Sequence, residues 1–116
     1  MTISDRRKGN ITIVQISGQI KHGPTAERFA KHFDTLMERG ERQFVFDMLE
    51  VPWMDTAGIN ATVSCFKHLR DRHKNGEIKL VLQGKSQELF VFYELNRIFK
   101  LYEDVESALA GFAPGD

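Results

Sequence analysis

The stretch that decides the fold is residues 44–58, which read FVFDMLEVPWMDTAG. It begins with a continuous apolar run that Asp47 closes, and such a run predicts a strand buried on both faces of a helix-covered sheet. Residues 48–54 are expected to form a loop, since they include Pro52. Asp55 then starts a helix, because its carboxylate can accept hydrogen bonds from the free N–H groups of a first helical turn.

Outward from this stretch, strand and helix patterns alternate along the chain. Apolar residues between positions 25 and 39 recur at steps of three and four, which indicates an amphipathic helix. The other expected elements are strands over 2–7, 11–17 and 77–82, a helix from Asp55 to about 75, a short helix over 87–96 capped by Ser86, an extended segment over 98–102 and a last helix after Asp104. This alternation predicts an α/β fold with a mostly parallel or mixed sheet.

Composition excludes several classes of protein. The 116 residues fit one domain, expected over 1–112 with a short flexible tail over 113–116. Sixteen Lys and Arg balance sixteen Asp and Glu, which argues against a nucleic-acid binder. No apolar run approaches the roughly 20 residues that cross a bilayer, so membrane insertion is not expected. A lone Cys65 excludes an internal disulfide, and a cytoplasmic location is the simplest expectation.

The start of the predicted helix offers a site for modification. Thr56 follows Asp55 directly and would lie at the exposed helix start, while Gly58 would let another backbone or a partner approach closely. A helix N-terminus tolerates a phosphate within its own chain. The phosphate would bring roughly −1.5 to −2 charges beside Asp55 and would disrupt a complex whose partner presents an acidic or apolar surface there.

These residues resemble the STAS domain of the anti-sigma factor antagonist type. The resemblance rests on FVFDMLEVPWMDTAGI and extends from ITIVQISGQI, through KLVLQG, to LYEDVESAL. It implies a four- or five-stranded mixed sheet with about four helices packed mainly on one side. It also implies that Thr56 is the phosphorylated residue and that Asp55 helps to present its hydroxyl to the kinase.

The resemblance also implies partners for a bacterial regulator of transcription. The family's members typically bind an anti-sigma factor that is also a serine/threonine kinase of the histidine-kinase-like ATPase type. Phosphorylation weakens that binding, and a phosphatase restores it. No cofactor is implied. The chain departs from the family pattern at Thr56, where Ser is commoner, in the bulky loop residues Glu50 and Trp53, and at Asn60, which favours a diverged relative.

Alternative interpretations stand beside this one. Thr56 is an ordinary residue at a helix start, and Trp53 could either anchor a partner or cover the core. Asp47 is expected to accept hydrogen bonds from loop N–H groups, since a metal site formed with Asp55 would lack a third ligand. The residues expected to bind a partner are Trp53, Asp55, Thr56, Ala57, Gly58 and Asn60.

Two other functional classes follow from the same residues. The domain could be a constitutive scaffold or accessory subunit of a sensory or transport complex, without phosphorylation. An enzyme is not expected, because no His or Lys is placed by the sequence to act as a base for Thr56. Cys65 is expected to be a buried, unreactive thiol. Residues 67–79 are expected to form a solvated basic face, or else to meet an acidic partner. Phe90, Phe92 and Tyr93 are expected at the core and its margin.

Overall fold

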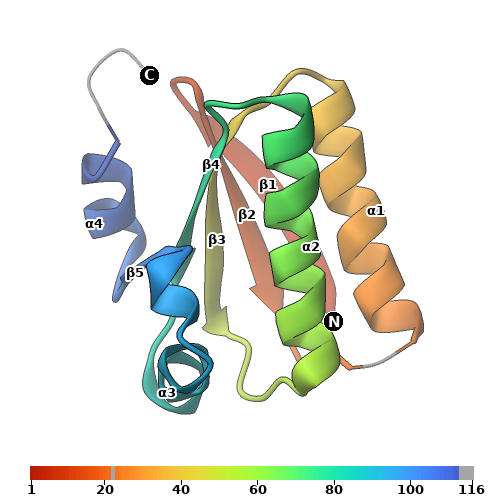
Figure 1. The fold of residues 1–116 in the computed structure, drawn as a ribbon, viewed down its shortest axis with the longest axis vertical. Helices are drawn as coiled ribbons and strands as arrows, with labels where there is room; N and C mark the ends of the chain where they lie inside the picture. The colour runs from red at the N-terminus through yellow and green to blue at the C-terminus, as the bar shows by residue number, and fades with distance from the viewer. Residues whose placement is uncertain (22, 113–116) are drawn as a thin grey trace.

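A five-stranded mixed sheet runs through the middle of the molecule in the computed structural model, which describes residues 1–21 and 23–112 (Figure 1). The strands follow one another in the order β1-β2-β3-β4-β5. The first two form an antiparallel hairpin, and every later pair is parallel. Their bounds are β1 Thr2–Lys8, β2 Ile11–Ser17, β3 Gln43–Glu50, β4 Glu77–Val81 and β5 Lys100–Tyr102.

Helices cover the sheet mainly on one side, as the resemblance to the STAS domain implies. Figure 1 shows α1 and α2 side by side on one face, α4 on the other face, and α3 at the end of the sheet where β3 leads toward α2. Parallel strands in sequential order require crossovers of one hand, which brings α1 and α2 to the same face. The helices are α1 Pro24–Glu38, α2 Thr56–Arg72, α3 Gly84–Phe92 and α4 Val105–Ala110, with a short 3₁₀ turn at Leu95–Arg97.

The apolar run of β3 supplies both cores. Phe44 and Phe46 point to the α1 and α2 face, where the rings of Phe33 and Phe44 lie 4.7 Å apart and those of Phe29 and Phe46 lie 5.5 Å apart. Val45 points to the opposite face, into a smaller cluster beneath α4. The prediction that this strand is buried on both faces is confirmed.

Four expectations about local structure were wrong. Lys79 does not belong to a solvated face, because it lies in β4, is 1% exposed and donates to Glu77 Oε1 at 2.9 Å. Residues 48–50 continue β3, because Glu50 pairs with Ser17 and its carbonyl accepts a hydrogen bond from Gly18 N at 2.9 Å. Ser86 does not cap α3, which begins earlier, and its buried hydroxyl donates to the Val51 carbonyl at 3.4 Å. Phe92 is 77% exposed and so is not a core residue.

The expected flexible tail, 113–116, lies outside the described residues. The expected single domain over 1–112 stays a prediction.

Candidate functional site

The junction between β3 and α2 is built around the carboxylate of Asp55. Its Oδ1 atom accepts hydrogen bonds from Ala57 N at 2.9 Å and Gly58 N at 3.4 Å, so Asp55 is the N-cap that the sequence predicts. Two of the free N–H groups of the first turn are thereby satisfied. Thr56 is the first helical residue and is exposed to solvent.

The helix start is packed closely against two connections of the chain. Ile20 and Met54 form an isolated parallel bridge beneath it. A Cβ atom placed on Gly58 would lie 3.0 Å from Met54 Cβ and 3.2 Å from Ile20 Cβ. Gly58 therefore allows a close approach to the chain's own connections. Because Gly58 is buried, a partner would contact its neighbours in the first turn of the helix.

Asp47 lies within β3, on the face of the sheet opposite α1 and α2. It alternates with Phe46 and Met48, which lie in the core under α1 and α2, so its side chain shares the face of Val45. Its Oδ1 accepts a hydrogen bond from Leu49 N at 3.2 Å, and the residue is 7% exposed. Because Leu49 belongs to β3, Asp47 stabilises the end of the strand, whereas Asp55 caps the helix.

Two hollows flank the start of α2. Trp53, which is 49% exposed, lines a hollow of about 220 Å³ together with Pro52, Met54 and three residues of α3, namely Lys85, Ser86 and Leu89. A groove of about 380 Å³ lies between α1 and α2 and contains Asn60 and Ala57. Thr56 lines neither hollow, but in the chain it lies between Met54, which lines the first, and Ala57, which lines the groove.

The sequence analysis missed the residues that other elements bring to these hollows. Ala26 and Ala30 lie four residues apart on α1, and Ala57 and Ala61 have the same spacing on α2. Paired small residues at this spacing on two helices are a signal that could have indicated the groove. Lys85 and Leu89 carry no comparable signal, because only the fold places α3 beside Trp53.

The described residues offer little for catalysis or for metal binding. Among them, no group of three or more His, Cys, Asp or Glu is placed to hold a metal ion. Within the same residues, no hydrogen bond joins the Thr56 hydroxyl to a basic side chain. Cys65 is 2% exposed, and burial raises the pKa of its thiol, which keeps it protonated and unreactive.

The site thus consists of an exposed Thr56 at the start of α2, a helix that Asp55 caps and that follows the parallel strand β3. The model of the STAS domain family matches residues 2–108 of this chain. The chain belongs to the STAS domain family. No curated protein matches it.

Solved STAS structures share the fold at low sequence identity. An anti-sigma factor antagonist from Mycobacterium paratuberculosis has a TM-score of 0.83 at 18% identity, covering 94% of this chain and 91% of its own. SpoIIAA from Bacillus, a cell fate determinant solved in the phosphorylated form, has a TM-score of 0.71 at 14% identity, covering 94% and 97%. A sulfate transporter family protein from Wolinella succinogenes has a TM-score of 0.70 at 20% identity, covering 87% and 83%.

These likenesses agree with the predicted fold class: a STAS-like mixed sheet of five strands with four α-helices in the described residues. Within those residues, no helix has both the length and the apolar character that a membrane crossing requires.

Proposed function

We propose that this STAS domain is a phospho-regulated switch for protein–protein interaction. A partner docks around the start of α2 while Thr56 carries a free hydroxyl, and phosphorylation of Thr56 releases it. The observation that carries the proposal is the exposed position of Thr56 as the first residue of α2, beside the capping Asp55 and, in the chain, between residues that line two surface hollows.

The electrostatics of the helix start explain how a phosphate would act. Asp55 Oδ1 already accepts from the N–H groups of Ala57 and Gly58, so a phosphate on Thr56 would extend outward beside that carboxylate. In the free chain the helix dipole and solvent tolerate the added charge. In a complex the same charge would be desolvated next to a carboxylate, which opposes binding.

Each site residue has a part in this proposal. Trp53 is a half-exposed aromatic anchor, and Asn60 and Ala57 form the adjoining wall of the groove. Asp55 fixes the first turn, and Gly58 lets that turn pack on the loops beneath it. The partner would be an anti-sigma factor that is also a serine/threonine kinase of the histidine-kinase-like ATPase type, with a phosphatase to reverse the modification, in the cytoplasm of a bacterium.

The experiment has a modification arm and a binding arm. Incubation with the candidate kinase and ATP should add ~80 Da, and Thr56→Ala should abolish the gain. Thr56→Glu should weaken binding of the partner by at least about tenfold. Ser107→Glu is the matched control, because Ser107 also lies in the first turn of a helix capped by an aspartate, and it should leave binding unchanged. Modification at another residue, or equal binding by wild type and Thr56→Glu, would contradict the switch.

A second candidate function keeps the fold without the switch. The likeness to a sulfate transporter family protein supports a constitutive scaffold or accessory subunit in a transport or sensory complex. In that case the partner would bind wild type and Thr56→Glu equally, and no kinase would modify Thr56. We expect no catalytic activity from either form, because nothing in the described chain activates Thr56 as a nucleophile.

A further inference from the structure

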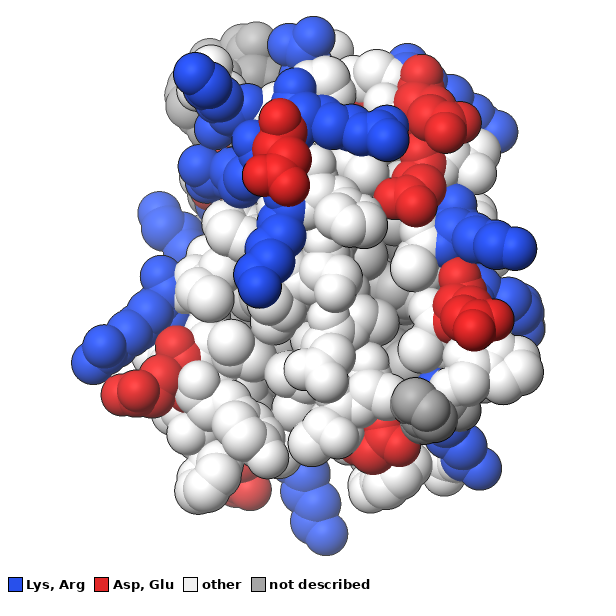
Figure 2. Space-filling view, turned by 45° about the vertical axis from the view of Figure 1, so that its right-hand side comes forward, with Lys and Arg blue, Asp and Glu red and all other residues white. Residues whose placement is uncertain are grey.

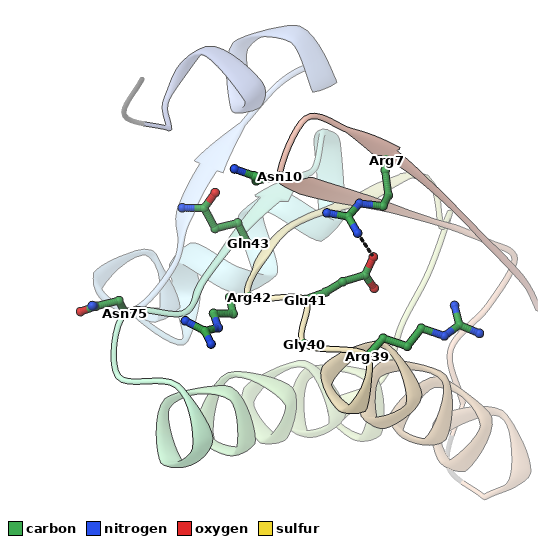
Figure 3. A pocket seen from close by; sticks show the side chains of 8 residues that line it. All are labelled: Arg7, Asn10, Arg39, Gly40, Glu41, Arg42, Gln43 and Asn75. Carbon is green, nitrogen blue, oxygen red and sulfur yellow. Dashed lines mark ion pairs between the residues drawn. The ribbon is translucent and has the colours of Figure 1, made fainter. Parts of the chain in front are cut away.

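A third pocket lies at the opposite end of α2 from Thr56. Its walls come from the turn between β1 and β2, the connection between α1 and β3, and the turn before β4 (Figure 3). Its volume is about 340 Å³, within the range of pockets that hold small molecules. The residues used below are Arg7, Arg39, Glu41, Arg42 and Gln43.

Two buried oxygen atoms of this pocket have no hydrogen-bond donor among the described residues. They are Glu41 Oε2 and Gln43 Oε1. The Glu41 side chain is only 8% exposed, and its other oxygen, Oε1, lies 3.5 Å from Arg7 Nη1. Buried acceptors are nearly always paired in folded proteins, so Glu41 Oε2, on a side chain that is nine-tenths buried, indicates a ligand that brings N–H donors.

The same pocket carries an excess of positive charge. Its lining residues include three arginines and a single carboxylate. In Figure 3 the guanidinium of Arg7 faces Glu41, while Arg39 and Arg42 project to opposite sides of the connection. Figure 2 shows Lys and Arg side chains gathered toward the end of the molecule where α1 and α2 finish, with a mostly uncharged surface below them. Guanidinium groups favour carboxylates and phosphates, which they can bind through two parallel hydrogen bonds.

We propose that this pocket binds a small acidic amino acid, a ligand with one ammonium and two carboxylates. The ammonium donates to Glu41 Oε2, the unpaired oxygen beside Arg7. One carboxylate binds Arg7, whose side chain is 56% exposed, and the second binds Arg42 at the rim. A simple anion would leave Glu41 Oε2 unpaired and would face this carboxylate, and a simple cation would be repelled by the three arginines.

The first test compares ligands by titration calorimetry on the full chain. L-glutamate and L-aspartate are the probes, glutarate lacks the ammonium, and L-glutamine lacks the second carboxylate. We expect one of the two acidic amino acids to bind at least about tenfold more tightly than glutarate and glutamine. The absence of binding by both acidic amino acids would overturn the proposal, and so would glutarate binding as tightly as glutamate.

The second test uses variants of the pocket. Glu41→Gln and Arg42→Gln should each weaken binding of the amino acid by about tenfold or more. Arg97→Gln is the matched control, because Arg97 is exposed, lies in the 3₁₀ turn outside the pocket and carries the same charge. If Glu41→Gln does not fold, as judged by circular dichroism, the exposed Arg42 still decides the question. An equal loss of amino-acid affinity in Arg97→Gln would show non-specific charge attraction and would overturn the proposal.

Discussion

The two ends of α2 use carboxylates in opposite ways. At the N-terminal end, Asp55 accepts two backbone N–H groups and fixes the first turn, so the chemistry left for a partner is the exposed hydroxyl of Thr56. At the other end, the Glu41 side chain is buried, with one oxygen near Arg7 and the other lacking a donor in the part of the chain that the structure describes. We therefore assign the satisfied carboxylate to the proposed docking surface and the unsatisfied one, near an arginine, to the proposed ligand pocket.

The largest expected effect comes from the core that both ends share. Phe46 is fully buried, and its ring lies 5.5 Å from those of Phe29 and Phe33 on α1. Phe46→Ala should lower the free energy of unfolding by about 3–5 kcal/mol, because it leaves a cavity under the helices. Urea denaturation followed by circular dichroism measures this loss. Phe92→Ala, at an exposed ring, should change it by less than about 0.5 kcal/mol, and a similar loss in both variants would contradict the packing described.

Gly58→Ala tests the packing at the N-terminal end of α2 alone. The added methyl group would meet Met54 Cβ and Ile20 Cβ, which lie next to the backbone and cannot move aside easily. We expect a net loss of about 1–2 kcal/mol in the free energy of unfolding, after a gain of up to about 1 kcal/mol in helix propensity. Asn60→Ala, at an exposed position of the same helix, is the control for urea denaturation. A more stable Gly58→Ala variant would show that the bridge beneath the helix can shift.

A smaller loss of stability is expected at the Asp55 cap, and a still smaller one at the basic end of α2. Asp55→Ala should cost about 1 kcal/mol of unfolding free energy, because two N–H groups lose their acceptor, while Asp55→Asn should keep most of it. Arg42→Gln removes a charge at the other end from an exposed position and should cost less than about 0.5 kcal/mol. Equal losses measured by denaturation in Asp55→Ala and Arg42→Gln would remove the contrast between the two ends.

The smallest expected effect concerns Asp104, a second aspartate cap, at α4. The backbone N–H of Ser107 donates to its carboxylate at 2.7 Å and, together with the Ser107 side chain, holds the pKa of Asp104 below its ordinary value of 3.8. Because the pKa is lower in the folded state, the contribution of this carboxylate to stability is present above about pH 4 and is lost as the pH falls below it. Thermal unfolding of wild type and Asp104→Asn between pH 7 and pH 2 should converge at the acid end. A constant difference at every pH would contradict this origin.

The sequence predicted the parts of the site that depend on local chemistry. Local patterns of a few residues predict three features: the buried run FVF of β3, the helix cap at Asp55 and the exposed position of Thr56. The continuation of β3 to Glu50 was missed, because it depends on pairing with β2 far away in the chain. Ser86 was misassigned for a similar reason, since its hydroxyl bonds to Val51 rather than to its own helix.

The pocket at the basic end could not have been predicted from local patterns. Arg7, Glu41 and Gln43 come from a hairpin and from the connection between α1 and β3, and neither segment has a recognisable binding motif. Burial of the Glu41 carboxylate results from packing, so only the three-dimensional structure shows that one of its oxygens lacks a donor among the described residues. The whole chain balances sixteen Lys and Arg against sixteen Asp and Glu, so its net charge does not reveal the local excess of positive charge at this pocket.

The bridge between Ile20 and Met54 limits what a mark on Thr56 can do. It fastens the two connections beneath the helix start, and Gly58 packs directly on both residues. The first turn therefore has little freedom to unwind or to swing when a charge is added above it. A phosphate at this position would change the charge of the surface that a partner contacts. No conformational change would have to be transmitted through the core of the domain.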